Sequence, residues 1–128
     1  MKHMLALSIA GVLAAPMAAL AHHSFAAEFD AEKPVTVQGA VQKVEWTNPH
    51  IWVYVDVKTA GGEVERWQCE GGSPNTLSRQ GWSRDTLKPG DQVVIEGFRA
   101  KNGSNTCNSR VVKTADGKRL FAGSSLGQ

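Results

Sequence analysis

Apart from His3, the chain of 128 residues has three histidines, and their type and spacing could support metal chemistry. His22 and His23 are adjacent, and His50 follows Pro49. If His22 were the first residue of a processed chain, its α-amine and imidazole would chelate a metal. A second imidazole would complete a planar set of three nitrogens, which suits Cu(II). The pattern therefore predicts a copper site formed by His22, His23 and His50.

Other side chains could complete or cover this site. Glu28 and Asp30 follow the histidine pair and would supply carboxylate oxygens if the N-terminal segment folds back. Trp46 or Trp52 would pack over the metal. The competing interpretation is that residues just after a cleavage site are polar and disordered. In that case His50 only hydrogen-bonds to its own turn.

An N-terminal leader is needed to expose His22. Lys2 precedes an apolar run over residues 4–21, "MLALSIAGVLAAPMAALA", which ends in Ala19-Leu20-Ala21. A charged start, an apolar middle and an A-x-A site are typical of a secretory signal peptide. A membrane-anchoring helix is the alternative, and Pro16 together with the marginal length of the run weighs against it. We therefore expect a periplasmic or secreted protein that begins at His22 and keeps no membrane anchor.

Composition limits the other functions. The formal net charge of the whole chain is +2, and loss of Lys2 with the leader brings it nearer to neutral, with no basic run. This argues against nucleic acid as a partner. No serine stands in a nucleophile-elbow context and no close carboxylate pair is present, so the sequence does not indicate an enzyme. A periplasmic protein partner of unknown identity stays open.

The sulfur-containing residues point to an oxidising compartment. Cys69 and Cys107 are far apart and form no C-x-x-C motif, so we expect them to form a disulfide. All the methionines lie in the leader. The processed chain therefore offers no thioether ligand for Cu(I).

Most of the processed chain has the pattern of strands separated by turns. Val53 and Val55 alternate with polar or aromatic residues, and the alternation after Val41 changes phase near Gly39, which predicts a β-bulge. Ser73 and Pro74 have the types expected at a helix start. The expected elements are strands over 35–46, 51–58, 63–70, 92–100 and 108–114, a short return strand over 118–123, and one short helix over 73–81.

This order predicts an all-β domain with one short helix, in the form of a small five-stranded OB-like β-barrel. The whole chain is expected to divide into a signal peptide (1–21), an N-terminal segment (22–34), the barrel (35–123) and a flexible tail (124–128). In such a barrel the third and fifth strands are neighbours, so Cys69 and Cys107 could meet if those strands run antiparallel. An open sandwich is the alternative.

Aromatic side chains support a second possible function. The interior of so small a domain cannot hold all five of the larger ones outside the N-terminal segment: Trp46, Trp52, Tyr54, Trp67 and Trp82. Trp52 and Tyr54 share the face of their strand that points away from the valines. Either the N-terminal segment, docked by Phe25 and Phe29, or the short helix covers them, or they form a platform for a ligand. The leading hypothesis is a periplasmic copper-binding protein, and the alternative is a metal-free OB module that binds a protein or a small ligand.

Several linear patterns resemble one known family. They are the start "HHSFAAEFD", the hairpin "VEWTNPHIWVYVDV", the segment "GSPNTLSRQGWSRDTLKPGD" and the short "FRAKNGS". Together they resemble an uncharacterised family of small exported bacterial proteins that is classed as a domain of unknown function. The resemblance covers nearly all of residues 22–123. It implies an exported, compact β-barrel and no particular activity.

Overall fold

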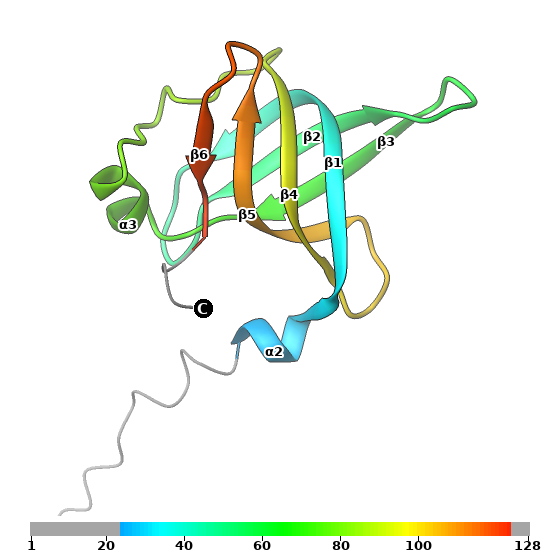
Figure 1. Cartoon of the computed structure of the whole chain (residues 1–128), viewed down its shortest axis with the longest axis horizontal. Helices are drawn as coiled ribbons and strands as arrows, with labels where there is room; N and C mark the ends of the chain where they lie inside the picture. Colours follow the sequence, from blue (N-terminus) through cyan, green and yellow to red (C-terminus); the bar gives the residue numbers. More distant parts are fainter. Residues whose placement is uncertain (1–23, 124–128) are drawn as a thin grey trace, which may run out of the picture.

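Strands dominate the part of the chain that the computed structural model describes, residues 24–123 (Figure 1). The predicted cleavage site, His22, His23 and the predicted tail over 124–128 lie outside the described residues. Within them, no helix is long and apolar enough to cross a membrane. The elements are α2 (Ser24–Glu28), β1 (Phe29–Glu45), β2 (Trp52–Lys58), β3 (Val64–Glu70), α3 (Pro74–Arg79), β4 (Gln92–Ala100), β5 (Thr106–Thr114) and β6 (Arg119–Phe121).

The strands form one sheet that closes on itself. Their order is β3-β2-β1-β4-β5-β6, and an additional pairing between β3 and β5 completes a ring of hydrogen bonds through five strands. β6 pairs only with β5. The predicted mostly-β fold with a short helix between the third and fourth strands is confirmed. Closure removes most of the exposed sheet edge that a small all-β domain would otherwise present.

Strands β3 and β5 are neighbours, as the sequence predicts, but they run parallel. The expectation that antiparallel strands would bring the cysteines together is therefore wrong in its geometry. Cys69 and Cys107 are direct register partners in the parallel pair, with their Cα atoms 4.5 Å apart, and they form the predicted disulfide. Both cysteines are fully buried. Such a bond is typical of proteins that fold in an oxidising compartment.

Two glycines allow the long strands to curve into the ring. A Cβ atom on Gly39 would lie 2.1 Å from the Asp56 carbonyl oxygen, and one on Gly97 would lie 2.0 Å from the Asn108 carbonyl oxygen. Only glycine permits such a close approach of two backbones. The register of β1 against β2 also shifts between Val41 and Lys43, so the bulge predicted from the phase change is confirmed. β1 begins at Phe29 and so extends into the segment for which the sequence predicts no strand.

The interior is built from alternate residues of these strands. Ile51, Val53 and Val55 are almost fully buried, as their alternation predicts. The predicted helix is also present as α3, where the Ser73 side chain accepts a hydrogen bond from the Thr76 N–H. Beyond it the buried Trp82 donates its indole N–H to the Phe121 carbonyl oxygen (2.9 Å), which ties the helix region to β6.

Candidate functional site

His50 stands at the entrance to β2, directly after a cis peptide bond between Asn48 and Pro49. Its imidazole is half-buried, and Nδ1 lies 3.0 Å from the Gly71 carbonyl oxygen. A carbonyl oxygen can only accept a hydrogen bond, so Nδ1 carries the proton in this contact. The lone pair of the neutral ring therefore resides on Nε2, which is left to bind something else.

A row of register partners crosses the sheet beside this histidine. Trp52 on β2 pairs with Glu70 on β3, Glu70 with Asn108 on β5, and Asn108 with Phe98 on β4. Glu70 and Asn108 are each only 8% exposed, although this row lies on the outer side of the ring. Residues far apart in the sequence therefore meet in one covered place, which we call the α2 end of the ring.

Glu70 is the most perturbed acid at the α2 end. Its Oε1 lies 3.7 Å from His50 Nδ1. Burial raises the pKa of Glu70 above the ordinary value, the nearby His50 opposes that rise, and the negative charge of Glu28 adds to it. Glu70 is thus influenced by an imidazole on one side and by a second carboxylate on the other, and a cation near Glu70 would be favoured by both carboxylates.

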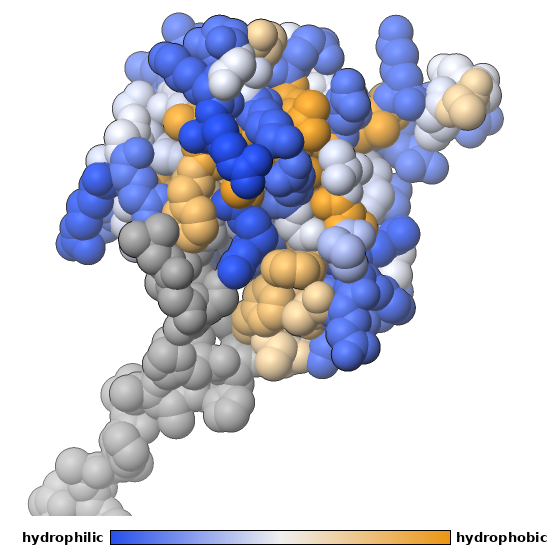
Figure 2. Space-filling model, viewed as in Figure 1, coloured by the Kyte–Doolittle hydropathy of each residue, from blue (hydrophilic) through white to orange (hydrophobic). Residues whose placement is uncertain are grey.

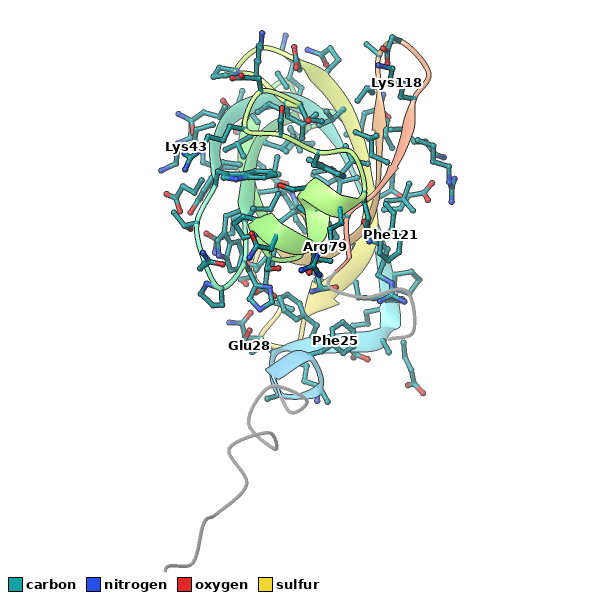
Figure 3. All side chains as sticks on the ribbon, turned by 90° about the vertical axis from the view of Figure 1, so that its left-hand side faces the viewer. Phe25, Glu28, Lys43, Arg79, Lys118 and Phe121 are labelled. Carbon is teal, nitrogen blue, oxygen red and sulfur yellow. A yellow bond between two sulfur atoms is a disulfide. The ribbon has the colours of Figure 1, made fainter. Side chains whose placement is uncertain are left out.

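Helix α2 covers the α2 end by aromatic packing. The ring centroids of Phe25 and Phe29 are 5.8 Å apart, and Phe25 meets Phe98 edge-on at 5.9 Å. Phe29 is buried at the start of β1. Figure 3 shows Phe25 and Glu28 together below the ring. The predicted docking of the N-terminal segment through Phe25 and Phe29 is therefore confirmed.

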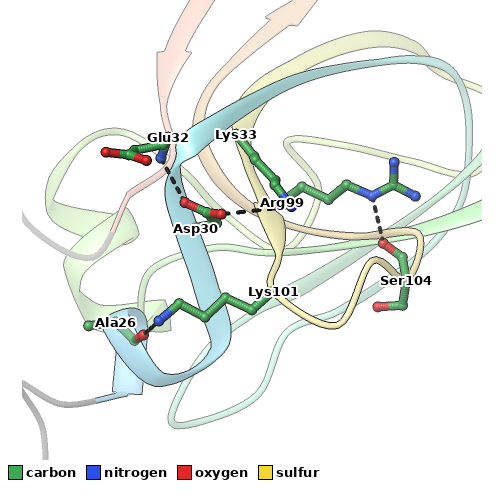
Figure 4. Close-up of polar contacts among 7 residues, drawn as sticks. All are labelled: Ala26, Asp30, Glu32, Lys33, Arg99, Lys101 and Ser104. Atoms are coloured by element: carbon green, nitrogen blue, oxygen red, sulfur yellow. Dashed lines mark hydrogen bonds and ion pairs between the residues drawn. The ribbon is translucent and has the colours of Figure 1, made fainter.

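The loop between β4 and β5 fixes the other side of α2 (Figure 4). The Lys101 backbone N–H donates to the Glu28 carbonyl oxygen at 2.8 Å, and the Lys101 ammonium donates to the Ala26 carbonyl oxygen. Arg99 holds the loop itself, because its guanidinium donates to the carbonyl oxygens of Ser104 (3.1 Å) and Gly103 (2.8 Å). α2 and this loop are thereby joined into one rim.

A groove of about 390 Å³ lies between α2, the outer faces of β2 and β3, and the β4–β5 loop. Trp52 and the buried Phe29 and Ala100 supply its apolar lining, and Glu28 and Gln68 belong to its polar lining. The view in Figure 2 shows a mostly hydrophilic surface with apolar atoms gathered over α2. The volume is within the range of small-molecule sites.

The sequence matches a family of unknown function, DUF6152, over residues 10–109. The chain belongs to this family. The finding confirms the resemblance read from the linear patterns, and it assigns no activity. A comparison with curated proteins finds no match.

The structure of this DUF6152 member brings together only part of the predicted metal set. His50 lies 3.7 Å from Glu70, and Glu28 is close enough to Glu70 to raise its pKa, but no contact joins Glu28 to His50 among the described residues. Asp30 instead accepts a hydrogen bond from the Glu32 N–H and pairs with Lys33 on its own strand. Within residues 24–123 no group of three or more His, Cys, Asp or Glu side chains could hold a metal ion. His22 and His23, the other predicted ligands, lie outside the described residues.

Most of the predicted aromatic residues are also engaged elsewhere, and only some could contact a ligand. Trp82 is buried, and Trp46 and Trp67 pack against the core. The Lys43 ammonium lies over the Tyr54 ring, and the Tyr54 hydroxyl donates to the Glu45 carboxylate, so both parts of this side chain already have partners at the surface. Of the two outward aromatics on β2, Trp52 alone lines the groove.

Sequence reasoning missed Glu70 and Gln68. One signal could have found them, because both alternate with the buried Cys69 along β3 and so must point outward beside Trp52 and Tyr54. The cover provided by α2 could not be read in this way. It depends on a strand pairing between Phe29 and Ala100, which are far apart in the sequence.

Proposed function

We propose that this DUF6152 protein is a periplasmic metal-binding protein, and that its metal is copper. The ligands are the α-amine and imidazole of His22, the imidazole of His23, and Nε2 of His50. The ring of five strands is an OB-type barrel that presents His50, and the N-terminal segment supplies the other nitrogens. When bound, Cu(II) would be held by nitrogen ligands. Cu(II) binds such ligands more tightly than other divalent first-row metals do.

One observation carries this proposal, the contact between His50 Nδ1 and the Gly71 carbonyl oxygen at 3.0 Å. Metal-binding histidines commonly donate one ring N–H to a backbone carbonyl or a carboxylate, which fixes the ring and leaves the other nitrogen for the metal. The Glu70 carboxylate stands nearby, with Oε1 3.7 Å from the same nitrogen, which is beyond hydrogen-bond distance. A histidine that served only its own turn would bond within residues 47–50 rather than to Gly71.

The position of α2 supports the proposal that His22 and His23 are the remaining ligands. His22 and His23 directly precede Ser24, the first residue of α2. That helix is docked at the α2 end by Phe25, and its last residue, Glu28, is close enough to influence the pKa of Glu70. The surrounding carboxylates lower the cost of bringing a divalent cation there.

The disulfide and the leader both support an oxidising compartment outside the cytoplasm. Cys69–Cys107 is stable where thiols are oxidised. The leader over 1–21 has the pattern of a signal peptide, and its removal after Ala21 creates the terminal amine that the site requires. Export and metal binding are thus linked, because a chain that kept its leader would lack one ligand.

The test compares copper binding by processed protein with that of two variants. Cu(II) titration followed by electron paramagnetic resonance should show one site with nitrogen ligands in protein that begins at His22. We expect His22→Ala and His50→Asn each to weaken affinity by at least roughly ten- to a hundredfold, because loss of a residue that only supports a ligand already costs that much. In His50→Asn the side-chain amide can still donate to the Gly71 carbonyl, so the change removes Nε2 while keeping the structural bond.

A protein with one alanine added before His22 is the matched control for the terminal amine. It keeps every side chain but moves the α-amine away from the imidazole of His22, so copper affinity should fall here as well. If both variants and the extended protein bind copper as tightly as the parent, the histidines are not ligands and the proposal fails.

A further inference from the structure

The groove at the α2 end has a chemistry of its own, independent of the histidines. Its apolar part is formed by the half-buried indole of Trp52 with the buried Phe29 and Ala100. The face of an indole carries partial negative charge and attracts weakly positive C–H bonds that lie flat against it. The groove therefore offers one flat aromatic wall, open to solvent, rather than an enclosed hydrophobic cavity.

The polar residues of the groove are mostly neutral, and they can both donate and accept hydrogen bonds. Thr106 Oγ1 accepts from Gln68 Nε2 (3.1 Å) and from Ser104 Oγ (3.0 Å), which leaves the Thr106 hydroxyl hydrogen available. The Asn102 Oδ1 accepts from the Ser104 N–H (3.0 Å), so its amide hydrogens point to other partners. Among the described residues, the side-chain oxygen of Gln68, Oε1, accepts no hydrogen bond from the protein. Amides and hydroxyls arranged in this way match a ligand whose groups both donate and accept.

The charged residues exclude two classes of ligand. Lys101 is the only cationic side chain among the described lining residues, and its ammonium already donates to the Ala26 carbonyl oxygen. A phosphate or carboxylate ligand would meet this single, already bonded ammonium together with the Glu28 carboxylate, so the groove offers it no net positive charge. Nucleic acid is excluded for the same reason, since its binding depends on lysine and arginine contacts to phosphate.

We propose that this groove is a binding site for a neutral saccharide, with a sugar ring stacked on Trp52 and its hydroxyls bonded to Gln68, Asn102, Thr106 and Glu28. A pyranose ring has one face of C–H bonds, which suits the indole, and an equatorial set of hydroxyls, which suits amide and carboxylate partners. The rim formed by α2 and the β4–β5 loop holds these groups in place through the Lys101 N–H bond to the Glu28 carbonyl oxygen. The site needs no metal.

The test uses the processed protein with a metal chelator present, so that failure of the copper proposal cannot affect it. Maltotriose and chitotriose are the saccharide probes, and choline chloride is the cationic probe. In ¹H–¹⁵N spectra, a saccharide should shift the indole N–H signal of Trp52 in a saturable way. The indole signal of Trp82 should stay in place, because that N–H is bonded to the Phe121 carbonyl oxygen inside the fold.

Three variants separate stacking from general damage. Trp52→Ala should weaken saccharide binding by about tenfold or more, and Gln68→Ala, at an exposed position, should weaken it by about threefold. Tyr54→Ala is the matched control, since Tyr54 lies on the same face of β2 but outside the groove, and it should bind as the parent does. The dispersion of the amide spectrum shows whether each variant is folded. If Trp52→Ala is not folded, the saccharide affinity of Gln68→Ala decides whether the groove is the binding site.

Three results would overturn the proposal. The first is that neither saccharide shifts the Trp52 indole signal at millimolar concentration. The second is that choline shifts it and the saccharides do not, which would assign the groove to an organic cation held by Glu28 and the indole. The third is equal saccharide binding by the parent and Gln68→Ala, together with equal binding by any folded Trp52→Ala protein.

Discussion

The two ends of the ring satisfy their acidic side chains in different ways. At the end opposite α2, which we call the hairpin end, the Asp91 carboxylate accepts from the Lys88 N–H and the Asp116 carboxylate from the Thr114 hydroxyl and the Lys118 N–H. These partners are two or three residues away in the sequence. Figure 3 shows Lys118 at the hairpin end and Glu28 at the α2 end.

At the α2 end, the neighbours of Glu70 come from other elements. His50 precedes β2, and Glu28 ends α2. The consequence appears in the acidity of the two groups. The Thr114 hydroxyl, and after it the Lys118 N–H, holds the pKa of Asp116 below its ordinary value, whereas burial raises the pKa of Glu70. Turn chemistry stabilises the hairpin end by itself, and the α2 end keeps polar groups whose requirements a ligand or metal could meet.

Of the changes that test this contrast, loss of the disulfide should have the largest effect on stability. Cys69 adjoins Glu70 and Cys107 adjoins Asn108, so the bond fastens the α2 end across a sequence separation of 38 residues. The Cys69→Ala/Cys107→Ala protein should lose about 2–4 kcal/mol of unfolding free energy, because the unfolded chain is no longer constrained. Urea titration measures the loss.

The distribution of that loss over the molecule sharpens the comparison. Hydrogen exchange in the double variant should accelerate more at the Lys101 amide, bonded to the Glu28 carbonyl oxygen, than at the Thr114 amide, bonded to the Lys118 carbonyl oxygen. A urea midpoint equal to that of the parent would mean that the bond contributes nothing to the ring. Equal acceleration at both amides would mean that the two ends unfold as one unit.

Phe25→Ala should have a smaller and more local effect. The phenyl ring is half-buried between Phe29 and Phe98, and its removal forfeits part of a buried side chain and two aromatic contacts. We expect a cost of about 1–2 kcal/mol, confined to the docking of α2. The Lys101 amide is again the reporter, and its exchange should accelerate while the Thr114 amide exchanges as in the parent. Unchanged protection of Lys101 would show that α2 is held by its backbone bonds alone.

The same contrast explains what the sequence could predict. The turns of the hairpin end are local, so "LKPGD" and Asp116-Gly117 indicate them directly, and the alternation of Val53 and Val55 predicts the core face. The Cys69–Cys107 bond is predictable from the cysteine count and the leader. These inferences need only neighbouring residues or composition.

The α2 end could not be predicted in that way. β1 starts at Phe29 because its first residues pair with Ala100 and Phe98 on β4, and no short pattern around Phe29 records this pairing. The parallel direction of β3 and β5 is likewise a property of ring closure. The candidate site shares this difficulty in part, because Glu28 comes to lie beside Gln68 and Glu70 only after β1 has paired with β4 and the ring has closed.

The smallest expected effect belongs to Asp116→Asn at the hairpin end. Because the folded-state pKa of Asp116 is lowered, its ionised form adds stability above the ordinary aspartate pKa, and this contribution is lost as the pH falls through the lower folded value. The asparagine oxygen can still accept from the Lys118 N–H but carries no charge. The melting temperature of the variant should therefore lie slightly below that of the parent at neutral pH, and the two should converge in acid. A difference that persists in acid would come from altered turn geometry. Since Asp116 contacts only its own turn, exchange at the Lys101 amide should not change, and a change there would show that the two ends are coupled.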